Sequence, residues 1–453
     1  MKRLVIAVIA GMVALATPAM AAQAQIQHHE GEIGGVKYRV EVPSNWNGTL
    51  LLYSHGYYPD GTAPPETLLS NRLYDTPEWL LRNGFALAAS DFEGLYGLAI
   101  EPALRDQIAL LDWFEANVGK PRRTIATGTS MGGGIAVQLA ERNLGRFAGV
   151  LGMCGEYDPQ GTWNTALDIT FTVKTLLAEG QDIDLVKARD PAASSEALKN
   201  AVLGAQNDDK GRARIALAAA FGNIPGWYSP HEPEPTDKIA EQAKWIYGAY
   251  IWGMGPQGGR EDLERRAGGN PSFNIGVDYR RLLSKSVLRD EVKKAYETAG
   301  LSLDEDLAKL AKAPRIAPDP RAMAYMYRYT VPSGRMPVPI VTLHSTGDGG
   351  AVADQARWYA EQVDRPDRIR QLYVGRGGHC GFSAAEELTA LKTLLHKVDT
   401  GRWPDTAPVK LNAAAASYGS TYQNVLFLDT FSDKEMAPAI TTFTPPEPAR
   451  PSH

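Results

Sequence analysis

The 453-residue chain has only two cysteines and no surplus of charge of either sign. Its 47 Lys and Arg residues against 52 Asp and Glu residues give a net charge of −5. A chain without a basic surplus has little electrostatic attraction for nucleic acid or for an anionic membrane surface. Heptads and internal repeats are absent, and no apolar run beyond the N-terminal stretch is long enough to span a membrane. We therefore expect neither nucleic acid nor a membrane as a partner of the mature chain.

The N-terminus holds the longest apolar run. It reads MKRLVIAVIAGMVALATPAMAAQAQ, in which Lys2 and Arg3 precede an apolar run from Leu4 to about Leu15, and Ala19-Met20-Ala21 ends it. This order is typical of a secretory signal peptide, and the run is too short for a membrane helix. No cysteine follows the expected cleavage site, which argues against a lipid anchor. We predict a signal peptide over residues 1–21 and export to the periplasm or beyond.

Apolar runs alternate with amphipathic helices in residues 22–155 and again in residues 336–403. Six runs have β character: TLLLYSHG, GFALAASDFEG, RTIATGTS, FAGVLGMCG, VPIVTLHSTGD and IRQLYVGRGGH. Near-continuous apolar strands separated by helices such as PALRDQIALLDWFEANVG indicate a parallel sheet covered on both faces. The predicted fold class is therefore α/β, with a doubly wound and mostly parallel sheet. Ahead of these runs, GEIGGVKYRVEVPSNWNG predicts two edge strands with a turn at Asn47-Gly48.

The alternation stops between Gly155 and about Met336. This stretch is rich in helix-forming sequence, holds clusters such as KWIYGAYIWGMG, and contains no convincing buried strand. Because long structureless loops are uncommon in compact domains, we predict a helical cap over residues 156–335, inserted before the last two strands. Residues 404–453 are predicted to form a C-terminal tail that lies over the surface. Four cap aromatics either line a pocket or form the cap core: Trp245, Tyr247, Tyr250 and Trp252.

The stretch ATGTSMGGGIA places Ser130 between a predicted strand and a predicted helix. Residues 128–132 fit G-x-S-x-G, the pattern of a serine nucleophile held on a sharp turn. Gly128 and Gly132 are expected there because the strained turn brings neighbouring backbone too close for a Cβ. The alternative is an ordinary glycine-rich turn.

A serine hydroxyl becomes a good nucleophile only when a base removes its proton. Among the eight histidines, His379 in GRGGHCGF is the best base, because it follows the last strand in a glycine-flanked loop. His344 also follows a strand, but its neighbours suggest another role. Asp348 ends VPIVTLHSTGD, and we predict that it orients the His379 imidazole. Asp354 is the second candidate for the acid, and a turn-forming role is the alternative for Asp348.

An acyl-transfer site also needs hydrogen-bond donors for the developing oxyanion. We predict the backbone N–H of Met131, directly after the nucleophile, as one donor. The backbone N–H of Tyr57, in the turn after TLLLYSHG, is the predicted second donor. His55 and Gly56 are expected to shape that turn, and the alternative is a tight turn without a catalytic part.

The two cysteines are predicted to form a disulfide. Cys154 ends the strand after the nucleophile helix and therefore lies at the same sheet edge as Ser130. Cys380 is adjacent to His379, whose loop must reach that edge to meet the serine. An exported chain folds in an oxidising compartment. The alternative is two free, buried cysteines.

These motifs resemble those of secreted bacterial serine hydrolases of the α/β-hydrolase superfamily, over about residues 35–155 and 336–403. The stretches VPSNWNGTLLLYSHGY, GTSMGGG, GMCG, GGNPSFNIGVDY and GHCGF are together similar to exported esterase-like or prolyl-oligopeptidase-like hydrolases. The His-Cys pair is similar to that of tannases and feruloyl esterases, in which a second cysteine precedes the nucleophile; Thr129 stands there in this chain. Ser-Met-Gly-Gly-Gly also resembles polyester hydrolases, which lack a large cap.

The site residues and the resemblance together predict an exported serine hydrolase that cleaves a carboxylic ester through an acyl-enzyme. The chain order Ser130, Asp348, His379 is that of α/β-hydrolases. We expect no metal and no cofactor, and a small-molecule ester or a short peptide as substrate. The first alternative is an exopeptidase or amidase with the same triad, since one scaffold supports both reactions. The second is an inactive hydrolase scaffold used for binding.

Overall fold

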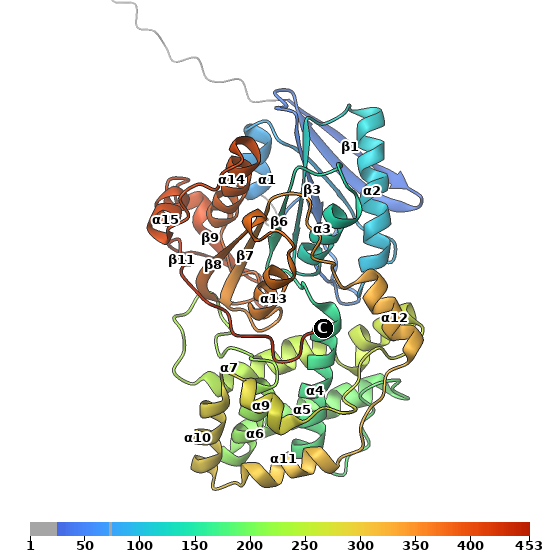
Figure 1. Ribbon diagram of the computed structural model, residues 1–453, viewed down its shortest axis with the longest axis vertical. Coiled ribbons are helices and arrows are strands. Elements are labelled where there is room, and N and C mark those ends of the chain that lie inside the picture. The colour runs from blue at the N-terminus through green and yellow to red at the C-terminus, as the bar shows by residue number, and fades with distance from the viewer. Residues whose placement is uncertain (1–24, 72–74) are drawn as a thin grey trace, which may run out of the picture.

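The computed structural model describes residues 25–71 and 75–453. The predicted signal peptide, residues 1–21, lies outside the described residues. Within the described part, no helix has the length and apolar character needed to cross a membrane. The chain forms one lobe built around a sheet and a second lobe made of helices (Figure 1).

A nine-stranded sheet forms the centre of the first lobe. Its order is β1 (Ile26–Ile33), β2 (Val36–Pro43), β4 (Ala86–Ser90), β3 (Thr49–Ser54), β5 (Arg123–Thr129), β6 (Gly149–Met153), β7 (Ile340–Gly347), β8 (Ile369–Gly377) and β11 (Ile440–Thr441). The six strands from β4 to β8 in this order are parallel, and β1, β2 and β11 pair antiparallel at the two edges. The parallel strands coincide with the six apolar runs of the sequence, which confirms the predicted α/β fold.

The predicted turn of the N-terminal strands is wrong. β1 and β2 join at Gly34 and Gly35, whose φ angles of 62° and 83° suit a two-residue hairpin. Asn47 instead accepts a hydrogen bond from the backbone N–H of Thr49 (2.9 Å) at the start of β3. The Asn-Gly signal therefore belongs to the connection from β2 to β3.

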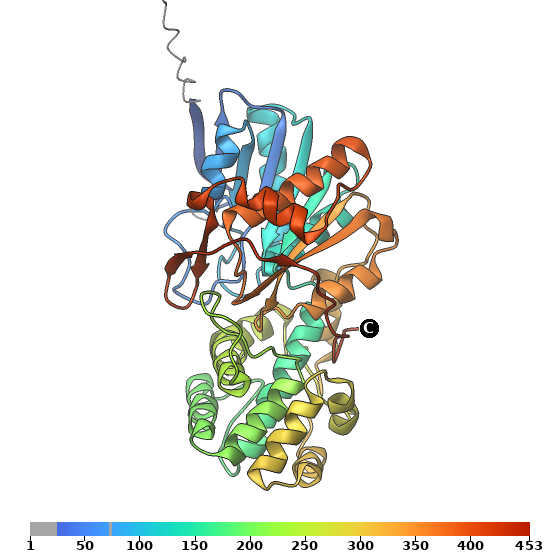
Figure 2. The ribbon, with the colours of Figure 1, turned by 90° about the vertical axis from the view of Figure 1, so that its left-hand side faces the viewer.

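Helices cover both faces of the sheet (Figure 2). On one face, Leu50 and Leu52 of β3 belong to a buried cluster with α2 (Ile100–Asn117), α3 (Met131–Arg142) and α13 (Asp354–Gln362). On the other face, Leu51 and Tyr53 belong to a cluster with α1 (Asp75–Arg82) and α14 (Ala384–Thr400). Successive side chains of a strand point to opposite faces, so one apolar run supplies both layers.

The chain between β6 and β7 forms the helical lobe, here called the cap (residues 156–335). Its helices are α4 (Pro159–Leu177), α5 (Pro191–Gly204), η1 (Ala205–Asn207), α6 (Asp209–Ala220), α7 (Lys238–Trp245), η2 (Ile246–Gly253), η3 (Pro256–Arg260), α8 (Glu261–Ala267), α9 (Tyr279–Lys285), α10 (Arg289–Ala299), α11 (Leu303–Lys312) and α12 (Pro320–Tyr329). Six of them begin at a side chain that accepts a backbone N–H: Asp158, Asp190, Asp208, Asp237, Asp278 and Ser302. These residues set the helix starts locally. The cap also has a hydrophobic core of its own.

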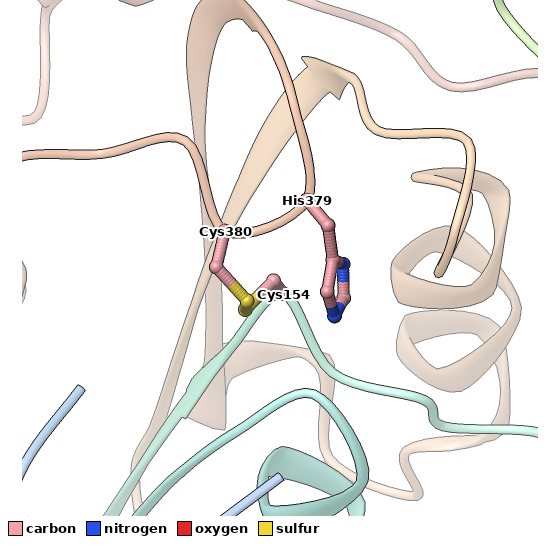
Figure 3. Close-up of side chains that lie close together, drawn as sticks. All are labelled: Cys154, His379 and Cys380. Atoms are coloured by element: carbon pink, nitrogen blue, oxygen red, sulfur yellow. A yellow bond between two sulfur atoms is a disulfide. The ribbon is translucent and has the colours of Figure 1, made fainter. Parts of the chain in front are cut away.

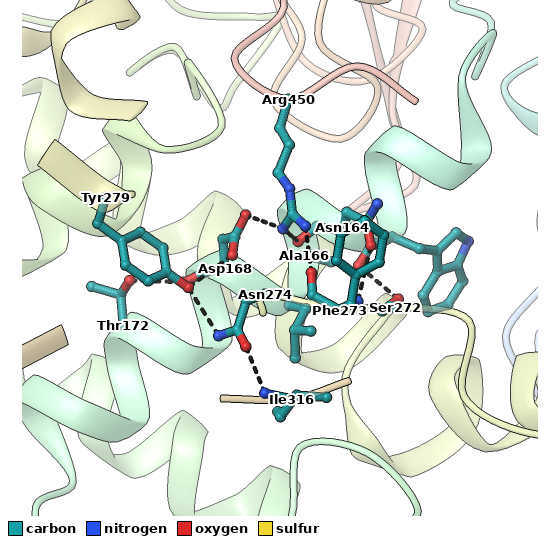
Figure 4. Close-up of polar contacts among 12 residues, drawn as sticks. Asn164, Ala166, Asp168, Thr172, Ser272, Phe273, Asn274, Tyr279, Ile316 and Arg450 are labelled. Carbon is teal, nitrogen blue, oxygen red and sulfur yellow. Dashed lines mark hydrogen bonds and ion pairs between the residues drawn. The ribbon is translucent and has the colours of Figure 1, made fainter. Parts of the chain in front are cut away.

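The C-terminal segment does more than lie over the surface. After η4 (Pro366–Arg368) and α14 in the core, it forms α15 (Pro408–Ala416), η5 (Ser420–Gln423) and the hairpin of β9 (Asn424–Phe427) and β10 (Ser432–Glu435). Its strand β11 then extends the main sheet beside β8. The chain end finally returns to the cap, where Arg450 pairs with the buried Asp168 of α4 (Figure 4). The segment therefore joins the two lobes.

Arg450 is held on several sides. Its guanidinium lies 2.5 Å from the Asp168 carboxylate, donates to the carbonyls of Asn164 (3.4 Å) and Phe273, and stands 4.8 Å from the centre of the Phe273 ring. The Tyr279 hydroxyl donates to the same carboxylate (2.8 Å). Asp168 thus has a charged partner and a neutral donor, which a buried carboxylate requires.

Candidate active site

Ser130 stands at the junction of β5 and α3, where the sequence predicted it. Its backbone has φ 56° and ψ −127°, a conformation that residues other than glycine rarely adopt. Its N–H donates to the carbonyl of Met153 on β6 (2.9 Å), and its carbonyl accepts from Gly133 (2.9 Å) and Glu156 (3.1 Å). The surrounding backbone thus holds the strained turn in place.

Gly128 and Gly132 have no room for a side chain. A Cβ on Gly128 would lie 2.1 Å from the carbonyl oxygen of Gly132, and one on Gly132 would lie 2.0 Å from that of Ser54. The turn at Ser130 is therefore packed backbone against backbone between β3 and α3. This close packing is the physical reason for both glycines of the motif.

The structure brings Ser130, His379 and Asp348 together. The Nε2 atom of His379 lies 2.8 Å from the Ser130 Oγ, and its Nδ1 atom lies 2.8 Å from the Asp348 Oδ2. The other oxygen of Asp348 accepts the backbone N–H groups of Gly350 (2.9 Å) and Ala351 (3.0 Å). The three residues follow β5, β8 and β7, so they meet at the carboxyl edge of the sheet, where open α/β sheets bind ligands.

The environment of His379 favours its protonated form. Burial by itself lowers the pKa of the imidazole, but the charge and hydrogen bond of Asp348, together with the charge of Glu156, raise it above its usual value. Asp348 has no exposed side-chain surface, so its charge acts with little screening by water. An imidazolium formed by accepting the serine proton is stabilised in place.

The two other candidates, His344 for the base and Asp354 for the acid, contact other groups. His344 lies in β7 with no exposed side-chain surface, its Nε2 is 2.7 Å from the carbonyl of Ala351, and burial lowers its pKa. Asp354 opens α13, accepts a hydrogen bond from the Asn223 amide (3.4 Å), and has a pKa that burial raises to about 7. The acid that reaches His379 is therefore Asp348.

Of the predicted oxyanion donors, Met131 follows Ser130 directly, and Tyr57 belongs to a loop whose Gly56 approaches the serine. Met131 is buried and is the first residue of α3, so its N–H has no acceptor within the helix and lies at the positive end of the helix dipole. A Cβ on Gly56 would lie 3.2 Å from the Cβ of Ser130, which brings the loop after β3 next to the serine. Tyr57 follows in this loop, and its hydroxyl donates to the carbonyl of Gly253 in the cap (3.1 Å).

His55 shapes the loop that carries Tyr57. Its ring is stacked between Phe92 (centroids 4.1 Å apart) and Tyr58 (4.5 Å). Its Nδ1 lies 2.7 Å from the carbonyl of Gly56, and burial lowers its pKa. A neutral, stacked imidazole in this position fixes the turn rather than exchanging protons with a substrate.

Cys154 and Cys380 form a disulfide, which confirms the prediction (Figure 3). Their Cα atoms are 5.2 Å apart across 226 residues of sequence. Cys154 follows β6 and Cys380 follows His379, so the bond joins the histidine loop to the strand beside the nucleophile. The free-cysteine alternative is thereby excluded.

Sequence reasoning missed Glu156. This residue follows the disulfide and donates its backbone N–H to the carbonyl of Ser130 (3.1 Å). Burial and the neighbouring Asp158 raise the pKa of its carboxyl to about 7, whereas His379 and Thr162 lower it. Its charge also acts on Tyr57 and Tyr250. The sequence signal was its position directly after Cys154-Gly155, at the end of a strand beside the nucleophile.

The four cap aromatics have different surroundings. Trp245 and Tyr250 are buried, Tyr247 packs partly buried against the cap core, and Trp252 is 54% exposed. Tyr247, Tyr250 and Trp252 lie in η2, a π-helical stretch, a feature frequent at functional sites. Two of the four are therefore buried, one is partly buried, and Trp252 faces solvent.

No model of a known protein family matches the chain. It is similar to the o-phthalyl amidase of Xanthobacter agilis, with 30% identity over 432 residues, which cover 87% of this chain and 92% of that protein.

Solved structures with low sequence identity also match. A 2-hydroxy-6-oxo-6-phenylhexa-2,4-dienoate hydrolase from Rhodococcus sp. strain RHA1 is 15% identical, and the match covers 83% of this chain and 99% of that chain with a TM-score of 0.37. The rice cell wall degrading esterase LipA from Xanthomonas oryzae is 12% identical, with 84% and 92% covered and a TM-score of 0.36.

Proposed function

Because the chain belongs to the α/β-hydrolase superfamily of serine hydrolases, together with the o-phthalyl amidase that it matches over 87% of its length, we propose that it hydrolyses a carboxylic amide through an acyl-enzyme on Ser130. The hydrogen-bonded line from Asp348 through His379 to the Ser130 Oγ carries this proposal. It is the arrangement that activates a serine for acyl transfer.

Each residue has a role in two half-reactions. In the first, the Ser130 Oγ attacks the carbonyl carbon, and His379 takes the hydroxyl proton while Asp348 holds the imidazolium. The N–H groups of Met131 and Tyr57 stabilise the oxyanion. The tetrahedral intermediate then loses the amine, which receives the proton from His379. In the second half-reaction water attacks the acyl-enzyme with His379 as base, and the acid and free Ser130 are released.

The choice of amide over ester rests on the amidase relative. The sequence alone favoured an ester, and both reactions pass through the same acyl-enzyme. They differ at the leaving group, because an amine must be protonated to depart. A phthalyl group is the acyl group of benzene-1,2-dicarboxylic acid, so the name of the relative points to an aromatic acyl group. Ester hydrolysis is the second candidate, since the same triad and acyl-enzyme serve both reactions.

We also propose that the chain acts after export. The apolar run of residues 4–15 supports this, as does the disulfide, because disulfides persist mainly in oxidising compartments. Fractionation of cells producing the full chain tests the proposal. Protein recovered only from the cytoplasm, with its N-terminal 21 residues intact, would contradict it.

Turnover of three matched substrates tests the reaction. We expect the mature protein to hydrolyse 2-carboxybenzoyl anilide and benzoyl anilide, and to cleave phenyl benzoate as well. A fluorophosphonate should label the wild type and not Ser130→Ala, which should lose at least about 10⁴-fold in kcat/KM. Cleavage of the ester with no detectable turnover of either anilide would replace the amidase with an esterase. Full labelling of Ser130→Ala would move the nucleophile elsewhere.

A further inference from the structure

Glycines border the two loops that carry the acid and the base. Gly347 and Gly349 stand on either side of Asp348, and Gly377 and Gly378 precede His379. The structure gives Gly378 a φ of 82°, a backbone reason for glycine. For Gly347, Gly349 and Gly377 the reason is space: a Cβ on Gly349 or Gly377 would lie nearest to a cap tryptophan, and one on Gly347 would lie 2.9 Å from the Cα of Gly377 and 3.0 Å from the Cβ of Trp227.

Trp245 of the cap lies directly on the acid loop. A Cβ on Gly349 would stand 2.5, 2.6 and 2.7 Å from the Cγ, Cδ2 and Cδ1 atoms of this indole. The next two residues, Gly350 and Ala351, donate their N–H groups to the Asp348 carboxylate. The Trp245 indole is therefore packed against the segment from Gly349 to Ala351, whose backbone amides hold the Asp348 carboxylate.

Trp227 of the cap contacts both loops. A Cβ on Gly347 would lie 3.0 Å from the Trp227 Cβ, and one on Gly377 would lie 2.5 Å from its Cδ1. The Trp227 carbonyl accepts from the backbone N–H of Gly378 (3.4 Å) and from the indole Nε1 of Trp245 (3.4 Å). The two tryptophans are therefore hydrogen-bonded to each other, and together they contact the loops that follow β7 and β8.

We propose that Trp227 and Trp245 are positioning residues, through which the cap holds the loops of Asp348 and His379 in line with Ser130. The proposal rests on the hydrolase function proposed above. It predicts that the alignment of the triad depends on the contact between the cap and the two loops. The core supplies the disulfide beside His379 and the turn at Ser130, but in the loop of Asp348 the cap indole fills the space above Gly349. Misplacement of a reacting group by about 1 Å costs on the order of 100-fold in rate.

Gly349→Ala tests this from the core side, because it leaves both tryptophans and the cap core in place. The added methyl displaces the indole, and we expect kcat/KM to fall by about 10- to 100-fold. The acid limb of the pH profile should move to lower pH, because a displaced Asp348 raises the pKa of His379 less. The downfield proton resonance of the hydrogen bond between His379 Nδ1 and Asp348 should broaden or shift. Gly204→Ala, at a helix end with no atom within 4 Å of the added Cβ, is the matched control.

Trp245→Phe and Trp245→Ala test the same contact from the cap side. The phenyl ring still covers Gly349, so it should recover much of the activity and of the pH limb that alanine loses. Val287→Ala, which truncates an exposed apolar side chain of the cap (63% exposed), should match the wild type. Unchanged kcat/KM and pH limb in Gly349→Ala and Trp245→Ala would overturn the proposal. The proposal would also be overturned if activity fell only in proportion to Tm while the acid limb of the pH profile and the proton resonance stayed as in the wild type.

The proton resonance also separates this proposal from the proposed function. If the wild type is neither labelled by a fluorophosphonate nor active on any ester or amide, the hydrolase proposal fails. The resonance of His379 still reports whether the tryptophans align it with Asp348. A resonance that Gly349→Ala leaves unchanged in such a protein would refute the positioning role independently.

Discussion

The core and the cap reach their shapes in different ways. In the core, the site is made where strand ends from distant parts of the sequence meet, and backbone packs on backbone, as Gly132 does on Ser54. In the cap, several helices begin at their own capping side chains, and buried side-chain pairs such as that of Arg450 with Asp168 hold distant segments together. We therefore expect that an added methyl group at the glycines of the core site will destabilise the protein strongly. The stability of the cap should instead depend on a small number of buried polar pairs.

Two histidines near Asp348, the partly buried His379 and the fully buried His344, give the largest expected contrast within the core. His379→Ala removes the group that lies 2.8 Å from the Ser130 Oγ, and kcat/KM should fall by about 10⁴-fold. His344→Ala removes a side chain whose Nε2 lies 3.9 Å from the same carboxylate and faces a backbone carbonyl. Its loss should be far smaller. Steady-state kinetics on the anilide and the ester measure both, and the opposite ranking would contradict the assignment of the base.

One methyl group at each of two glycines compares the lobes directly. Gly132→Ala places a Cβ 2.0 Å from the Ser54 carbonyl oxygen, where only backbone movement makes room. The free energy of unfolding should fall by at least about 3 kcal/mol, or the protein should not accumulate. Gly204→Ala in α5 meets nothing within 4 Å and should be neutral or stabilising by up to about 1 kcal/mol. Thermal and denaturant unfolding of the two variants measure the difference, and equal stabilities would refute it.

The ion pair between tail and cap tests the second half of the comparison. Arg450→Ala leaves the Asp168 carboxylate buried without its charged partner, and stability should fall by about 3 kcal/mol or more. Arg189→Ala removes an exposed guanidinium that pairs with Asp182 and Asp184, and a much smaller change is expected because water screens that pair. Chemical denaturation at neutral pH compares them. A smaller loss for Arg450→Ala than for Arg189→Ala would mean that the tail does not secure the cap.

Glu156 should give the smallest effect and the clearest sign. For the wild type, kcat/KM should rise with pH through the pKa of His379, because only the neutral imidazole accepts the serine proton. Glu156→Gln removes a carboxyl that is only partly ionised near pH 7, because its own pKa is about 7, and whose charge raises the pKa of His379, so the acid limb should move to lower pH by less than about one unit. Glu435→Gln, in the exposed strand β10, is the control. A shift to higher pH would show that Glu156 does not act on His379 through its charge.

The local sequence was sufficient to predict those elements whose structure depends on neighbouring residues in the chain. The six parallel strands are apolar runs bounded by turns, and the turn at Ser130 is encoded by the glycines around it. The hairpin turn was misplaced, because Asn47-Gly48 and Gly34-Gly35 both carry turn residues and only the pairing of β1 with β2 selects between them. The course of the tail was also missed, since the strand β11 has only two residues and is defined by its neighbour β8.

The sequence by itself determined the α/β class, the chain order of Ser130, Asp348 and His379, and the meeting of Cys154 with Cys380, since parallel strands bring their carboxyl ends to one edge. The sequence favoured Asp348 over Asp354 as the acid, but both follow the same strand six residues apart, and only the tertiary structure shows that Asp348 contacts His379 whereas Asp354 contacts Asn223. Tertiary structure also decided that Glu156 lies beside the triad and that cap tryptophans cover the loop glycines. Such contacts join residues far apart in the chain, as Trp245 and Gly349 are. A local sequence pattern does not indicate which glycine will contact which tryptophan.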